Sequence, residues 1–120
     1  MFKGALILES LRVGTNLSNL NLTARQIYRF RREDATADQP DTWSVIELEI
    51  HDADAADVAQ ALSEALASGW YVDFRSDTEV FVAFAGRVFR YARGDQVGRA
   101  EAQAHGRSAG VPNSQLDWPA

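Results

Sequence analysis

The residues with the clearest chemistry are arginines gathered before and inside a predicted helix. Arg87, Arg90 and Arg93 precede Asp95, and Arg99 follows one turn into the helix that Asp95 should cap. Guanidinium groups beside a helix N-terminus bind phosphates or carboxylates. Strand alternation separates Arg87 from Arg90, and Asp95 occupies the free backbone amides as the cap. We therefore expect either an anion site at Arg90, Arg93 and Arg99 or an edge strand that its charges protect from pairing.

A second set of polar side chains lies in the aromatic stretch between residues 69 and 95. Tyr71, Asp73 and Arg75 alternate with apolar residues, so they share one face of a strand. Together with Tyr91, they are the residues that this stretch could turn toward a groove. In such a groove, Asp73 could act as an acid or a base on a small anionic metabolite.

Other reaction chemistries have few candidate residues. The chain has no cysteine and two histidines, which excludes disulfides, thiolate metal sites and cysteine nucleophiles. His51 stands beside Asp52 and Asp54. These side chains are of the types that bind metal ions, although their spacing matches no recognised metal motif. The alternative interpretation is a surface histidine followed by acids that cap the next helix. His105 falls inside a helix. We expect no metal, no cofactor and, on balance, no enzyme.

Charge and length limit the class of protein. The 120 residues carry a net charge of −5, which argues against nonspecific nucleic-acid binding. Residues 33–64 hold ten acids and no lysine or arginine, so they form either an acidic face or ordinary solvated surface. The sequence shows neither a signal-peptide pattern nor a membrane-length apolar run. We expect one domain over 1–120 in a cytoplasmic protein that contacts no membrane.

The elements that must position these residues follow from the apolar patterns. Three short strands, 70–75, 80–84 and 87–91, are separated by tight turns and should form an antiparallel meander. Earlier strands are predicted over 4–9, 23–32 and 43–51. Helices are predicted over 54–68 and 96–108, ended by Gly69 and Gly110. The order βββαβββα predicts a two-layer α+β domain with a mainly antiparallel sheet of five to six strands.

Three further expectations concern the pairing and direction of the strands and the C-terminal tail. Antiparallel pairing of 23–32 with 43–51 would set arginines opposite glutamates, as cross-strand ion pairs or as a carboxylate-and-arginine active site. The helix 54–68 between two strands suggests that those strands lie parallel in one sheet. The tail 113–120 should pack back on the core through Trp118.

The second half of the chain resembles a family of small uncharacterised prokaryotic proteins. The resemblance is carried by Gly69-Trp70-Tyr71 with Asp73-Phe74, by Val88-Phe89-Arg90-Tyr91 with Arg93-Gly94-Asp95, by Gly106-Arg107-Ser108 with Gly110-Val111-Pro112, and by Gln115-Leu116-Asp117-Trp118. It implies a shared small α+β fold and transfers no activity and no catalytic residue.

Two functions remain open from the sequence. The first is a non-enzymatic interaction module that self-associates through the edge strand of the meander. The second is a binder of a small anionic metabolite, or a modest enzyme acting on one, that uses Arg90, Arg93 and Arg99.

Overall fold

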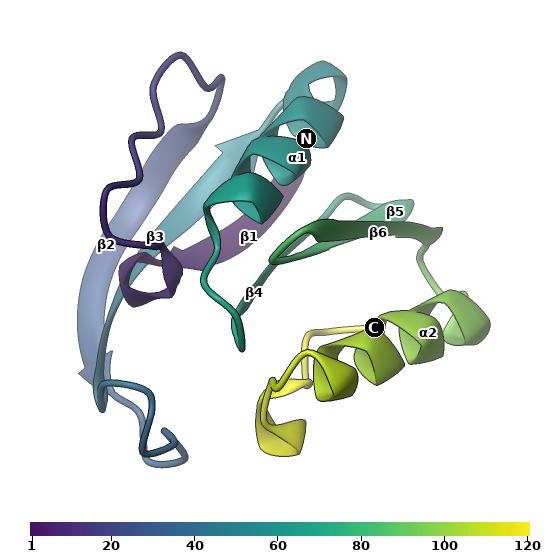
Figure 1. Cartoon of the computed structure of the whole chain (residues 1–120). Coiled ribbons are helices and arrows are strands. Elements are labelled where there is room, and N and C mark those ends of the chain that lie inside the picture. The colour runs from purple at the N-terminus through teal and green to yellow at the C-terminus, as the bar shows by residue number, and fades with distance from the viewer.

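The computed structural model describes residues 1–120 as one six-stranded antiparallel sheet with two α-helices (Figure 1). The strands are β1 (Phe2–Ile7), β2 (Thr23–Arg31), β3 (Thr42–Ile50), β4 (Tyr71–Arg75), β5 (Glu79–Phe84) and β6 (Arg87–Ala92). The helices are α1 (Ala55–Ala65) and α2 (Gln96–Ser108), with short 3₁₀ turns at 8–10, 52–54 and 113–115. The predicted α+β class and the order of elements are confirmed.

The strand order across the sheet is β2-β3-β1-β4-β5-β6. Strand β1 pairs antiparallel with both β3 and β4, so β3 and β4 run parallel to each other with β1 between them. The predicted parallel relation across α1 is therefore confirmed, although the two strands do not touch. The β4–β5–β6 meander is antiparallel throughout, as expected from its tight turns.

The two helices cover opposite faces of the sheet. Helix α1 packs Val58, Ala59 and Leu62 into a core that includes Phe74 and Phe81. On the other face, α2 and the C-terminal tail cover a second core, which includes Val80, Val82, Phe84, Ala102 and Trp118. Alternate residues of β5 belong to the two cores, as the uniformly apolar strand predicts. The expected two layers therefore become three over the half of the sheet that contains β5 and β6.

The apolar pattern of the second helix predicts a buried face of Val97, Ala100 and Ala104, but α2 turns these three residues outward. Val97 is 70% exposed, whereas Ala102 and Gly106 are buried. A Cβ on Gly106 would lie 2.6 Å from Leu116 Cδ2, and one on Gly98 would lie 2.7 Å from Tyr91 Cβ. These glycines allow the helix to approach the sheet and the tail closely, which apolar periodicity alone does not reveal.

The end of α1 also differs from its prediction. The helix stops at Ala65, three residues before Ser68, because Leu66 is extended and forms a bridge with Leu11. Gly69 has a φ of +88°, so it serves the turn into β4 and does not end the helix.

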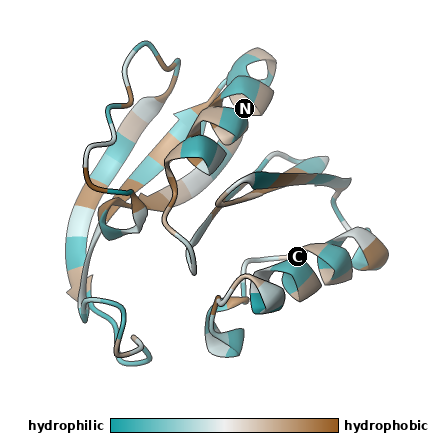
Figure 2. Cartoon of the chain, viewed as in Figure 1, coloured by the Kyte–Doolittle hydropathy of each residue, from teal (hydrophilic) through white to brown (hydrophobic).

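One half of the sheet has a face that no helix covers. On the α1 side, residues of the loop between β1 and β2 pack against the core, among them Leu17 and Leu22. On the α2 side, β2, β3 and β1 have no helix over them, because α2 lies beyond β6 in sequence and packs at that end (Figure 1). Figure 2 shows hydrophobic and hydrophilic residues interspersed along β2 and β3, as expected for strands whose two faces differ in polarity.

Neither helix has the length and apolar content needed to cross a membrane.

Candidate functional site

The open face of the sheet carries a row of carboxylates at its centre. The strand register aligns Glu47 of β3 with Ala5 of β1, and Ala5 with Asp73 of β4. Adjacent strands are about 4.8 Å apart, so the two carboxylate residues stand roughly 10 Å apart across the small alanine. Ala5 thus forms a low floor between two acidic side chains.

A row of basic residues lies beside the carboxylate row. The register aligns Glu49 with Lys3, and Lys3 with Arg75. A bulge in β2 between Ala24 and Gln26 turns Arg25 onto the same face. Arg25 Nε donates to Glu49 Oε2 at 2.8 Å, and Lys3 Nζ lies 3.9 Å from Glu49 Oε1. The row therefore contains three cations and one anion.

An aromatic and apolar surface lies on the other side of the carboxylate row. Tyr28 pairs with Val45, and Phe30 pairs with Trp43, across β2 and β3. The Phe30 and Trp43 ring centroids are 6.0 Å apart, and those of Trp43 and Trp70 are 5.0 Å apart. The open face therefore passes from aromatic residues to carboxylates and then to cations.

Two adjoining hollows lie on this open face, one at its aromatic end and one at its charged end. Together we call them the groove. The aromatic hollow has a volume of about 180 Å³. The charged hollow has a volume of about 420 Å³. Ala5 and Asp73 line both hollows. The remaining lining residues of the aromatic hollow are Ile7, Tyr28, Phe30, Arg32, Trp43, Val45, Trp70, Tyr71, Gln115 and Asp117, and those of the charged hollow are Lys3, Gly4, Arg25, Glu47, Leu48, Glu49, Arg75 and Pro119.

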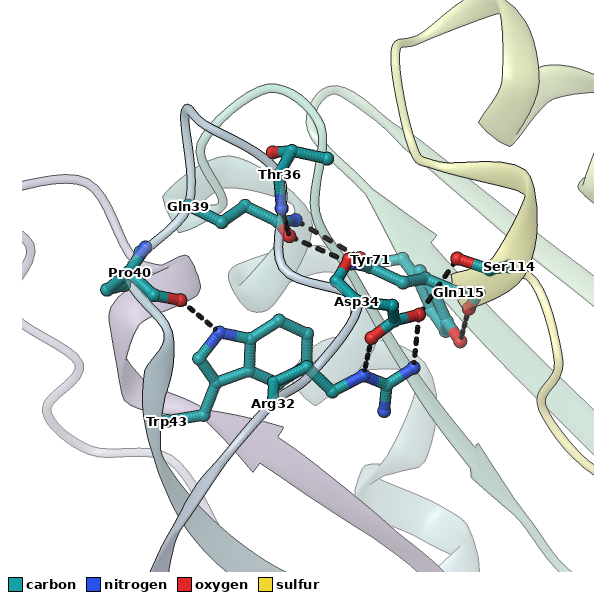
Figure 3. A network of polar contacts seen from close by, with 9 residues as sticks. All are labelled: Arg32, Asp34, Thr36, Gln39, Pro40, Trp43, Tyr71, Ser114 and Gln115. Atoms are coloured by element: carbon teal, nitrogen blue, oxygen red, sulfur yellow. Dashed lines mark hydrogen bonds and ion pairs between the residues drawn. The ribbon is translucent and has the colours of Figure 1, made fainter.

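A polar clasp joins the β2–β3 connection to the C-terminal tail at the aromatic end of the groove (Figure 3). Gln115 Nε2 donates to Gln39 Oε1 at 2.8 Å, and Gln39 Nε2 donates to Gln115 Oε1 at 3.1 Å. Ser114 Oγ donates to Asp34 Oδ2 at 2.8 Å. Arg32 pairs with the same Asp34 carboxylate and lies over the Trp43 ring. The clasp joins two segments that are more than 70 residues apart in the sequence, and so holds the aromatic end of the groove together.

Tyr71 fixes the tail from inside the groove. Its hydroxyl donates to the backbone oxygen of Gln115, and its ring packs edge-on against Trp118 at 5.1 Å between centroids. Burial, followed by the nearby charge of Asp73, raises the pKa of Tyr71. The phenol therefore stays protonated and acts as a hydrogen-bond donor at neutral pH.

Asp73 is the most perturbed acid in the groove. Burial raises its pKa from 3.8 to about 6, although the nearby Arg75 guanidinium opposes this shift. Arg75 Nη1 lies 3.6 Å from Asp73 Oδ2, which is an ion pair without a hydrogen bond. The side chain of Asp73 keeps 20% of its area exposed, toward the two hollows. Its carboxylate is thus poorly stabilised and open to a partner.

The structure gathers three of the seven residues that the sequence singled out for ligand binding. Tyr71, Asp73 and Arg75 lie on one face of β4 and line the groove.

The arginines of the expected anion site do not converge. Arg90 lies on the α1 side of the sheet, over the Phe81 ring, and binds Glu79 with both a 2.6 Å and a 2.9 Å hydrogen bond. Arg93 donates to the backbone oxygen of Ser76 at 3.2 Å. Arg99 lies on the α2 side and donates to the backbone oxygen of Trp118 at 2.5 Å. Because Arg90 and Arg99 stand on opposite faces of the sheet, one small anion cannot contact both.

Tyr91 also lies outside the groove. It is buried under α2, and its hydroxyl accepts a hydrogen bond of 2.7 Å from Trp118 Nε1. Tyr91 therefore holds the C-terminal tail in place, and Leu116 and Trp118 of the tail are buried in the second core.

The histidines do not form a metal centre. Asp52 pairs with the N-terminal amine, and Asp54 accepts a hydrogen bond from Asn21. The structure contains no group of three or more His, Cys, Asp or Glu side chains that could hold a metal ion. His105 packs its ring against Phe84 at 5.0 Å, and burial lowers its pKa.

Sequence reasoning missed most of the aromatic wall and the clasp. The shared direction of Tyr28 and Phe30 is visible in the alternation of β2, and so is that of Tyr71 and Asp73 in β4. Their meeting on one face depends on the insertion of β1 between β3 and β4, which alternation does not reveal. Of the predicted Arg/Glu pairs, only Arg25 with Glu49 forms between β2 and β3.

Comparison of the chain with protein-family models, with curated proteins and with solved structures gave no match. The resemblance carried by residues 69–118 therefore stays a prediction.

Proposed function

We propose that this chain is a small-molecule binding protein whose ligand carries a positive charge and a flat apolar group. The observation that carries the proposal is the position of Asp73, an incompletely paired carboxylate at the junction of the two hollows. Concave sites with apolar walls and a few convergent polar groups are where proteins bind small molecules.

The charge of the ligand follows from the surroundings of Asp73. Its one close cation, Arg75, is too far away for a hydrogen bond, and the Asp117 carboxylate from the tail lines the same hollow. The carboxylate therefore has no side-chain donor and only its own backbone amide nearby, and an ammonium group would supply the missing donors. A hydrogen bond to a charged group contributes about 1.5–3 kcal/mol.

The flat group follows from the aromatic hollow. Its volume of about 180 Å³ suits one ring system, and its walls include Tyr28, Trp43 and Tyr71. Aromatic faces favour both stacked rings and nearby cations. A cation held at Asp73 would place its apolar group among these walls.

Phenethylamine is a suitable probe, because it combines one ring with one ammonium group. We expect saturable binding by calorimetry at pH 8, with a change in tryptophan fluorescence, since Trp43 and Trp70 line the groove. Asp73→Asn should weaken binding about tenfold or more, by loss of the charged partner. Ala5→Leu should abolish binding by filling the floor.

Asp77→Asn is the matched control, because it removes the same charge from an exposed turn. If phenethylamine and other aromatic amines fail to bind, or if Asp73→Asn and Asp77→Asn bind alike, the proposal is wrong.

The affinity should also depend on pH in a defined direction. With an Asp73 pKa of about 6, the carboxylate is protonated at lower pH, so binding at pH 5 should be about tenfold weaker than at pH 8. The other charged residues that line the two hollows with Asp73 are Arg75 on β4, Lys3 on β1, Glu47 and Glu49 on β3, Arg25 on β2, Arg32 after β2 and Asp117 in the tail. Asp73→Asn should remove most of this pH dependence.

Self-association through a sheet edge is the second candidate, and the geometry favours β2 over the expected β6. All nine residues of β2 are exposed, and Ile27 at its centre is 68% exposed. Symmetric antiparallel pairing about Ile27 would, however, set Arg25 opposite Arg29 of the second copy, which opposes association. Light scattering at low and high salt tests this: a dimer should form only when salt screens the arginines.

A further inference from the structure

We propose that the ligand is an α-amino acid with an aromatic side chain, bound by its ammonium group at Asp73 and by its carboxylate at Arg75. This inference rests on the proposed function and adds the second charged group of the ligand. It would make the groove an amino-acid site.

The order of residues across the open face carries the inference. The groove passes from the aromatic wall to the carboxylate of Asp73 and then to the cation of Arg75. An aromatic amino acid presents its groups in the matching order, with the ring first and the ammonium and carboxylate groups together at the other end. A ligand with a positive charge alone would leave the basic row unused.

Arg75 is the basic residue best placed for the carboxylate. In the basic row that contains Arg75, Glu49 Oε2 lies 2.8 Å from Arg25 Nε, and Glu49 Oε1 lies 3.9 Å from Lys3 Nζ. Arg25 and Lys3 therefore already share one acid. The one acid close to Arg75 is Asp73, and 32% of the Arg75 side chain is exposed in the charged hollow. A guanidinium with free donors binds a carboxylate through two parallel hydrogen bonds.

The spacing of Asp73 and Arg75 fits the head of an amino acid. The two residues are two positions apart on β4 and share one face, with 3.6 Å between their charged atoms. The ammonium and carboxylate groups of an α-amino acid are attached to one carbon, so they form a compact pair of opposite charges. When the ligand lies with its ammonium group at Asp73 and its carboxylate at Arg75, each ligand charge contacts a side chain of opposite charge.

The test compares three probes by calorimetry at pH 8, using the whole chain. L-phenylalanine carries both charges, phenethylamine lacks the carboxylate, and 3-phenylpropionate lacks the ammonium group. We expect L-phenylalanine to bind at least tenfold more tightly than phenethylamine, and 3-phenylpropionate to bind most weakly.

Arg75→Gln should erase the preference for L-phenylalanine without weakening phenethylamine binding, because it removes a cation that competes with the ligand ammonium group for Asp73. Arg93→Gln is the control, since it removes a cation that bonds to the Ser76 backbone outside the groove. Circular dichroism and the melting temperature establish that both variants are folded.

The outcomes separate the two proposals. If phenethylamine binds as tightly as L-phenylalanine, and Arg75→Gln changes both equally, the amino-acid inference is overturned while the cation site stands. If L-phenylalanine and phenethylamine both fail to bind, both proposals are overturned. A preference for L-phenylalanine that Arg75→Gln removes supports both.

Discussion

Replacing Asp73 with asparagine should make the protein more stable at neutral and alkaline pH. The folded chain raises the pKa of this carboxyl group from 3.8 to about 6, chiefly by burial. Between these values the native state retains a proton that the unfolded state has lost. Stability is therefore lost as the pH rises through this range, and the whole cost is present above about pH 7.

The magnitude follows from the difference between the two pKa values. They differ by roughly 2, and a difference of one corresponds to about 1.36 kcal/mol, so the charged carboxylate costs about 3 kcal/mol at pH 8. An asparagine at this position would occupy nearly the same volume without the charge. For a domain of this size, a gain of about 2–3 kcal/mol corresponds to a rise in melting temperature of roughly 10 °C.

The assay is thermal unfolding of wild type, Asp73→Asn and the control Asp77→Asn between pH 4 and pH 8. Asp73→Asn should match wild type near pH 4, where the aspartate is neutral in the folded state, and exceed it increasingly up to pH 8. Asp77→Asn removes the same formal charge from an exposed turn and should show no such trend. A constant difference between Asp73→Asn and wild type across this range, or a less stable variant at pH 8, would refute the reasoning.

Three further predictions concern the tail, the clasp and the opposite face. Gly106→Ala should lower the unfolding free energy by about 1–3 kcal/mol in chemical denaturation, because its Cβ would overlap Leu116, whereas helix propensity alone predicts a gain. Gln115→Ala should cost about 1–3 kcal/mol and alter tryptophan emission, since it removes the paired amide bonds to Gln39. Arg90→Ala should leave phenethylamine affinity unchanged in calorimetry, because this side chain lies on the α1 side of the sheet.

A binding role also explains why a destabilising carboxylate would be kept in the sheet. Sites that bind charged ligands commonly hold groups that the folded protein alone does not satisfy. If an ammonium ligand pairs with Asp73, ligand binding recovers part of the cost of burying the charge. The stability gain of Asp73→Asn and its loss of ligand binding therefore have one cause, the buried and incompletely paired carboxylate of Asp73.

The sequence by itself determined the elements and most of their faces. Period-2 alternation placed Tyr71, Asp73 and Arg75 together on β4, and the short turns required the antiparallel meander. Asp95 was identified as the cap of α2, and its side chain accepts a hydrogen bond from the Gly98 backbone amide. These features depend on residues close in the chain, so local patterns suffice to predict them.

Only the tertiary structure decided which faces meet. The groove exists because β1 lies between β3 and β4, which aligns Ala5 with both Glu47 and Asp73. Helix α2 packs on the face of the sheet opposite Arg90, so Arg90 and Arg99 are separated and the arginine cluster that is conspicuous in the sequence is dispersed. Strand order depends on pairing between residues distant in the chain, and alternation specifies the two faces of a strand without specifying its neighbours.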